Sequence, residues 1–153
     1  MHIKIIGVGK TRKNDFISLL IDYERRIGRF CPISFTEIKD SDNPEPELQQ
    51  KAEGEKILSA LKPSDYLVLL DEKGKNFTST GFAQKIESLQ GKNIKNCVFV
   101  MGGAYGFGKA VYERANEKIA LSQMTFTHQM VRVIFMEQLY RAFTIINKMP
   151  YHH

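Results

Sequence analysis

The sequence has no tryptophan, only two cysteines and five prolines among its 153 residues. Cys31 and Cys97 lie far apart, without a CxxC pair and without histidines at a metal-ligand spacing, which argues against a disulfide framework and a zinc site. They are expected to be reduced thiols in a cytoplasmic protein. No apolar run approaches the roughly 20 residues of a membrane-spanning helix, and the apolar part of the N-terminus is too short for a signal peptide.

The composition is that of an ordinary globular domain, with 42% hydrophobic and 25% charged residues. A chain of this length is expected to form one domain spanning residues 1–153. The formal charge of +5 is compatible with nucleic-acid binding, although many proteins of this charge bind none. Basic residues form short clusters at Lys10-Arg12-Lys13 and Arg25-Arg26-Arg29. From charge alone, a solvated basic surface is an equally good interpretation.

Five short apolar runs predict the strands of a sheet. Three of them, IKIIGV, YLVLL and CVFVM, are almost continuously apolar, which is typical of strands covered on both faces. The sequence therefore predicts an α/β fold with a mostly parallel sheet flanked by helices. The five predicted strands are Ile3–Val8, Ile33–Ile38, Tyr66–Leu70, Cys97–Met101 and Lys118–Leu121.

Helical periodicity occupies the segments between these runs. A helix beginning near Asn14 or Asp15, either of which could provide its N-cap, carries apolar residues as far as Ile27. A weaker helical pattern covers Leu48–Leu61, and Thr80 is a candidate N-cap for a helix that ends at Gly91.

The final helix, predicted over His128–Lys148, is apolar on more than one side. Two explanations fit this pattern: the helix is buried centrally, or one of its faces forms a dimer interface. In a domain of this size we favour the dimer.

The segment Gly7-Val8-Gly9-Lys10-Thr11 follows a strand and ends in GKT, as a phosphate-binding P-loop does. A P-loop requires a glycine five positions before the GK glycine, and Lys4 occupies that position. A dinucleotide-binding fingerprint fails as well, since Arg12 stands at its third glycine position. A strand that ends in a flexible turn is the better interpretation.

Gly102, Gly103 and Gly106 follow a buried strand directly, where glycines let a ligand approach the backbone closely. A tight turn between strand and helix would also explain them. A second strand ends at Leu121, and His128 opens the last helix. Loops after strand ends are where α/β proteins bind small ligands. Asp71, at the end of another strand, could bind a ligand hydroxyl, but a role in a turn is favoured.

Taken together, these segments resemble the RlmH family of small bacterial SPOUT-class methyltransferases. The resemblance runs through IKIIGVGK, LLDEKGK, FVMGGAYG and IALSQMTFTHQMVRVIFMEQLYRAFTIINKMPYHH, and so covers essentially the whole chain. It implies a C-terminal trefoil knot, one of the rare exceptions to unknotted chains. It also implies S-adenosylmethionine-dependent methylation of N3 of a pseudouridine in 23S ribosomal RNA. The family acts on the assembled ribosome as a homodimer.

The resemblance further implies which residues form the site. The proposed cofactor contacts are Leu70, Gly102, Gly103, Gly106, Leu121, Ser122, Gln123, Met124, Thr125 and Phe126. Polar groups for substrate placement, charge stabilisation or proton transfer are His128, Arg132, Tyr151 and His152, with the general base left open. The family's chemistry requires no metal and involves no membrane.

A non-catalytic RNA- or ribosome-binding dimer with the same fold is the alternative. The intact glycine loop and the complete C-terminal tail favour the enzyme, because a protein that only binds would need neither.

Overall fold

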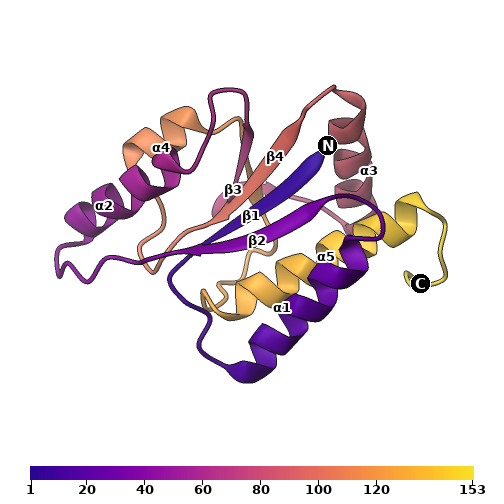
Figure 1. Cartoon of the computed structure of the whole chain (residues 1–153), viewed down its shortest axis with the longest axis horizontal. Helices are drawn as coiled ribbons and strands as arrows, with labels where there is room; N and C mark the ends of the chain where they lie inside the picture. Colours follow the sequence, from indigo (N-terminus) through magenta and orange to yellow (C-terminus); the bar gives the residue numbers. More distant parts are fainter.

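The computed structural model describes all 153 residues and contains five parallel strands in the order β2-β1-β4-β3-β5 (Figure 1). The strands are β1 (His2–Val8), β2 (Ile33–Ile38), β3 (Tyr66–Asn76), β4 (Asn96–Met101) and β5 (Glu117–Ala120). The helices are α1 (Asn14–Ile27), α2 (Pro46–Ser59), α3 (Ser79–Gly91), α4 (Lys109–Arg114) and α5 (Met130–Ile146). The α/β fold and all five predicted strands are confirmed.

Strand β3 is longer than the apolar run predicts. It continues past Leu70 to Asn76 after a register shift, because Lys75 pairs again with Ile119 of β5. Gly74 permits this close approach, since a Cβ at Gly74 would stand 2.6 Å from the backbone of Ile119. This polar extension could not be recognised from apolar residues alone.

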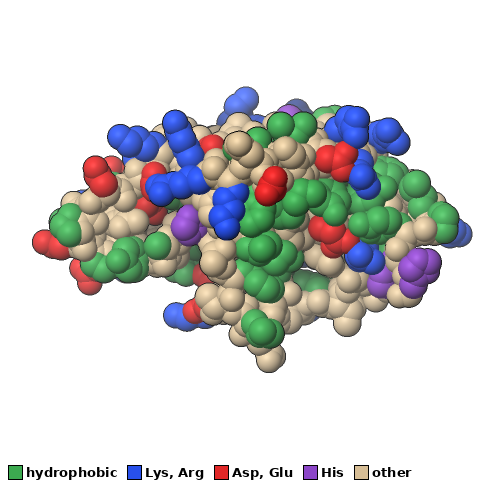
Figure 2. Space-filling view, turned by 90° about the horizontal axis from the view of Figure 1, so that it is seen from below, with side chains coloured by type: hydrophobic (Ala, Val, Ile, Leu, Met, Phe, Trp, Pro, Cys, Tyr) green, Lys and Arg blue, Asp and Glu red, His purple; other side chains and the backbone are tan.

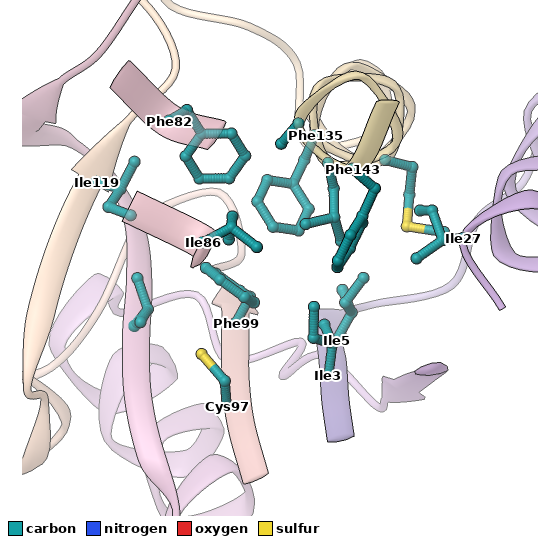
Figure 3. Close-up of a cluster of buried hydrophobic side chains, with 14 of the residues drawn as sticks. Ile3, Ile5, Ile27, Phe82, Ile86, Cys97, Phe99, Ile119, Phe135 and Phe143 are labelled. Carbon is teal, nitrogen blue, oxygen red and sulfur yellow. The ribbon is translucent and has the colours of Figure 1, made fainter. Parts of the chain in front are cut away.

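Helices cover both faces of the sheet, which explains the apolar strands. Alternating residues of β4 show the two sides: Cys97 and Phe99 pack toward α1, α3 and α5, whereas Val98 and Val100 pack toward α2 and α4. Figure 3 shows the larger cluster, in which Phe99 lies against helix side chains. Its labelled members are Ile3, Ile5, Ile27, Phe82, Ile86, Cys97, Phe99, Ile119, Phe135 and Phe143.

Two helix starts differ from the sequence prediction. Thr78, and not Thr80, caps α3, since the Thr78 side chain accepts a hydrogen bond from the Gly81 amide at 3.1 Å. Helix α1 begins at Asn14 without any side-chain cap. Asp15 therefore lies inside the first turn, where its charge still suits the positive end of the helix dipole.

Helix α5 lies on the sheet between α1 and α3 (Figure 1). Its own residues Phe135, Met136, Leu139 and Phe143 are fully buried. Central burial, the alternative to a dimer interface for this helix, therefore accounts for most of its apolar surface. None of the helices combines the length and apolar character required to cross a membrane.

Candidate functional site

A cavity of about 640 Å³ lies at the carboxyl edge of the sheet, where β3, β4 and β5 end. Three loops meet there: residues 70–73 at the turn within β3, residues 101–107 after β4, and residues 121–128 between β5 and α5. Adjacent parallel strands bring their carboxyl ends to one edge, and this is the usual ligand position in open α/β sheets. The predicted pocket is thus a single cavity in the structure.

The loop after β4 is shaped by glycine. The Gly106 amide donates to the Gly103 carbonyl at 3.1 Å, and Gly106 has φ +72°, in the left-handed region that favours glycine. A Cβ at Gly103 would stand only 2.7 Å from Oε2 of Glu53. The turn therefore presents bare backbone to the cavity on one side and contacts a carboxylate on the other.

Helix α2 supports this loop from behind. Glu53 is 3% exposed, and its Oε1 accepts hydrogen bonds from the Ser41 amide at 3.0 Å and from Gln49 Nε2 at 3.1 Å. Gln50 Nε2 donates to the Tyr105 carbonyl at 2.6 Å. Sequence reasoning missed Glu53 and Gln50. The available signal was the four-residue spacing of Glu53 from the buried Ile57, which puts a charge on the inward face of α2.

Two carboxylates line the β3 side of the cavity. Asp71 Oδ1 accepts a hydrogen bond from the Lys73 amide at 2.8 Å, which confirms its predicted role in a turn. Its Oδ2 accepts the hydroxyl of Tyr112. Burial and this hydrogen bond raise the pKa of Tyr112 to about 12, so its phenol is a neutral donor at physiological pH. With two carboxylates, Asp71 and Glu72, against the one cation Lys73, this wall keeps a net negative charge, which favours a cationic ligand.

The loop between β5 and α5 forms the opposite wall. Ser122 Oγ accepts a hydrogen bond from the Met124 amide at 2.9 Å, and Thr127 Oγ1 accepts one from the Met130 amide at 3.2 Å. These bonds fix the loop locally, while the side chain of Met124 remains 75% exposed at the cavity mouth. The wall thus offers apolar surface to a ligand.

The structure brings most of the predicted cofactor residues together. Gln123 is the exception, since it does not line the cavity. Among the residues predicted to act on the substrate, His128 lines it as well. The predicted residues at the cavity are Leu70, Gly102, Gly103, Gly106, Leu121, Ser122, Met124, Thr125, Phe126 and His128.

Arg132 lies elsewhere. Its side chain is 1% exposed and does not line the cavity. Its guanidinium donates to the carbonyls of Val8 and Gly9 at 2.6 and 2.9 Å, and to Thr11 Oγ1 at 2.7 Å. It also pairs with Glu37 Oε1 at 3.2 Å. Arg132 thus joins α5 to the end of β1, the segment that follows it and, through Glu37, to β2.

The C-terminal tail is also away from the cavity of its own chain. The Tyr151 hydroxyl donates to Glu137 Oε1 at 3.1 Å on α5, and its ring packs at 4.9 Å from that of Tyr140. His152 Nδ1 lies 3.4 Å from Arg141 Nη1. Tyr151 and His152 therefore do not join His128 within one chain. No group of three or more His, Cys, Asp or Glu side chains is arranged to hold a metal ion.

Comparison with protein families gives a match over nearly the whole chain. Residues 1–152 match a family model described as "Predicted SPOUT methyltransferase". This match includes the three loops that form the cavity.

Curated relatives are similar over their full length. A protein of Parabacteroides distasonis is 51% identical, one of Phocaeicola vulgatus 48% and one of Christiangramia forsetii 46%, each alignment covering 100% of this chain and 99% of the relative. All three are named ribosomal RNA large subunit methyltransferase H.

Proposed function

The chain belongs to the SPOUT methyltransferase family, and we propose that it methylates N3 of a pseudouridine in the 23S RNA of the assembled ribosome, with S-adenosylmethionine as methyl donor. One observation carries the proposal. The cavity of about 640 Å³ is built from the glycine loop after β4 and the two neighbouring strand-end loops. The naming of the full-length relatives as ribosomal RNA methyltransferases supports the RNA substrate.

The cavity suits S-adenosylmethionine in size and chemistry. Its volume is within the roughly 300–1,000 Å³ of small-molecule sites. Leu70, Leu121 and Met124 offer apolar surface for adenine, and the bare backbone at Gly103 allows close approach of a planar group. Asp71 and Glu72 favour a positive charge. When bound, S-adenosylmethionine supplies a methyl group already activated by its sulfonium.

The residues of the protein must then orient the base and manage its proton. N3 of pseudouridine is a weakly acidic imide nitrogen that has to lose its proton before or during transfer. Under this proposal His128 hydrogen-bonds the target base at the cavity rim, and the loops hold the two reactants in line. Arg132, buried away from the cavity, acts as a positioning residue for the β1–α1 and α5 segments.

The proposed active form is a homodimer. Exposed apolar side chains on the α1 and α5 side support it, namely Ile17, Ile21 (61% exposed) and Met130, and Figure 2 shows hydrophobic side chains gathered on this face. In the dimer, Tyr151 and His152 of one copy complete the cavity of the other. This arrangement would reconcile their proposed role with their distance from the cavity of their own chain. The proposal also includes the family's trefoil knot and a cytoplasmic location, where ribosomes are found.

Transfer of a labelled methyl group from S-adenosylmethionine tests the function. Whole bacterial ribosomes and free 23S RNA are the substrates, and Gly103→Arg is the variant that fills the glycine loop. Label on whole ribosomes that is absent with the variant supports the proposal. Cofactor binding without label on either substrate refutes the target, and absence of cofactor binding leaves the non-catalytic ribosome-binding dimer as the function.

A further inference from the structure

The loop between β1 and α1 lies next to the rim of the cavity. The Arg12 amide donates to Gln129 Oε1 at 3.0 Å, and Gln129 Nε2 donates to the Lys10 carbonyl at 2.8 Å. Gln129 directly follows His128, which lines the cavity. A single side chain thus joins the loop to the site by two hydrogen bonds.

Hydrogen bonds within the protein hold the backbone of this loop and take up the amides of Gly9, Thr11 and Arg12. Arg132 binds the carbonyls of Val8 and Gly9, and Glu37 Oε1 accepts the amide of Thr11 at 2.8 Å. The Gly9 amide donates to the Ile38 carbonyl at 2.8 Å. This is the GKT segment that resembles a P-loop in sequence, but the amides of Gly9 and Thr11 donate to protein acceptors. The exposed cationic side chains are therefore the main groups that could bind an anion at this loop.

Three cationic side chains project from this fixed backbone. Lys10, Arg12 and Lys13 are all exposed, and none has a carboxylate within ion-pair distance. Glu37 pairs with Arg132, while Asp40 beside Gly9 and Asp15 in the first turn of α1 lie near the loop without forming an ion pair with its cations. The loop therefore carries three positive charges that form no ion pair.

The second basic cluster of the sequence differs. Arg25 and Arg26 on α1 both pair with Asp22, each at 2.7 Å. Their charges are partly neutralised within the helix. On the face that Figure 2 shows, several Lys and Arg side chains lie near a histidine. Of the two clusters, the β1–α1 loop is the one that has no ion pair at all and a direct link to the cavity.

We propose that Lys10, Arg12 and Lys13 form a docking site for the phosphate backbone of the ribosomal RNA and so bring the target nucleotide to the cavity. The identity of the RNA rests on the proposed function. Phosphates are the partner that such a cluster fits, because lysine and arginine side chains on a preformed loop bind them by charge and displace condensed counterions. The short path through Gln129 to His128 sets the distance between the docked backbone and the reacting base.

The test compares two triple variants with equal loss of charge. The loop variant carries Lys10→Gln, Arg12→Gln and Lys13→Gln and so lacks the three cations of the β1–α1 loop. The opposite-edge variant carries Lys62→Gln, Lys92→Gln and Lys95→Gln. It lacks three exposed cations at the other edge of the sheet, where β3 and β4 begin. Both variants and the unaltered protein are titrated with ribosomes and with protein-free 23S RNA over a series of salt concentrations. Binding of S-adenosylmethionine is measured in parallel as a check on folding.

We expect the loop variant to bind both ribosomes and free RNA about tenfold or more weakly than the opposite-edge variant. The slope of log affinity against log salt should fall by about one for each phosphate that the loop variant no longer binds. S-adenosylmethionine affinity should be unchanged in both. Equal affinities for the two variants would overturn the proposal, as would a weakening confined to whole ribosomes, which would indicate a ribosomal protein as the partner.

Failure of the proposed function is a separate result. It would appear as absence of methyl transfer by the unaltered protein in spite of loop-dependent RNA binding, and the docking site would then still stand. If the unaltered protein binds neither ribosomes nor RNA, the docking site is wrong.

Discussion

Glu53 occupies the space that a side chain at Gly103 would need. Its Oε2 lies 2.7 Å from the position of a Cβ at Gly103, and the carboxylate is held in place by Ser41 and Gln49. The carboxylate is almost fully buried and has little freedom to withdraw. The loop after β4 therefore packs against the fixed carboxylate of Glu53. A methyl group at position 103 would displace the backbone of this loop.

The first prediction concerns this contact. Gly103→Ala should weaken binding of S-adenosylmethionine by about tenfold or more, equivalent to about 1.4 kcal/mol, because the loop must move toward the cavity to relieve the contact. Isothermal titration calorimetry measures the affinity. Gly91→Ala is the matched control, since a Cβ at Gly91 meets nothing within 4 Å. Equal affinities for the two variants would show that the loop tolerates the methyl group.

A double-mutant cycle assigns the cause. If the carboxylate is the obstacle, Gly103→Ala should cost less cofactor affinity in a Glu53→Ala background than in the unaltered protein. Additive effects in the cycle would instead mean that Glu53 and Gly103 act independently. Thermal unfolding of each variant shows whether removing the Ser41 and Gln49 hydrogen bonds has affected the fold as a whole.

A second prediction separates a positioning role from a catalytic role for Arg132. Arg132→Lys should lower the free energy of unfolding by about 3 kcal/mol, because one ammonium group cannot serve two carbonyls, a hydroxyl and Glu37 at once. Denaturant titration measures this change. Arg25→Lys, on a side chain that is 73% exposed, is the control and should leave stability unchanged. Unchanged stability with a lower kcat in Arg132→Lys would instead indicate a direct catalytic contact.

The sheet and the position of the cavity could be predicted from the sequence because both depend on local patterns. The residues of β4 alternate between two buried faces. An almost continuous apolar run therefore indicates a parallel strand that helices cover on both faces. Gly102 and Gly103 come directly after it, and the carboxyl ends of parallel strands share an edge. The start of α3 was less predictable, since Thr78 and Thr80 are equally good caps and their side chains lie 3.1 Å apart.

The remaining features depend on contacts between distant segments. Arg132 donates a hydrogen bond to Thr11, which lies 121 positions away in the sequence. The position of Arg132 in its helix does not indicate this partner. Glu53 supports a loop that lies far along the chain, and only its place on the inward face of α2 gives a signal. The tail turns back onto Glu137 and Tyr140, which no pattern around Pro150 indicates. Sequence patterns thus locate the backbone of the site and miss the side chains that support it.

A third prediction concerns acid stability. Burial alone would raise the pKa of Glu117, but hydrogen bonds from Lys85 and Tyr66 outweigh burial and lower it. A carboxylate whose pKa is lower in the folded protein stabilises the fold above the ordinary value of 4.5, and this stabilisation disappears as the pH falls through the folded pKa. Glu117→Gln should therefore lower the free energy of unfolding at neutral pH. The variant should also lose less of its stability than the unaltered protein when the pH is lowered.

Urea titrations from about pH 7 to about pH 3 measure this effect as the difference in unfolding free energy between Glu117→Gln and the unaltered protein. The difference should shrink as the pH falls. Glu113→Gln is the control, because the Glu113 side chain is 64% exposed and only distantly paired with Lys109. A difference that is constant over the whole range would mean that the charge of Glu117 does not contribute.

The last prediction tests the shared site of the proposed homodimer. One variant, Gly103→Arg, lacks a functional cofactor loop, and another, Tyr151→Ala with His152→Ala, lacks the tail side chains that lie outside the cavity of their own chain. Each should be inactive alone. After unfolding and refolding together in equal amounts, about half of the dimers are mixed, and each contains one intact cavity with one intact tail. Methyl transfer should then recover to about a quarter of the unaltered level. If the tail acted within its own chain, no mixed dimer would contain a complete site, and activity would stay absent.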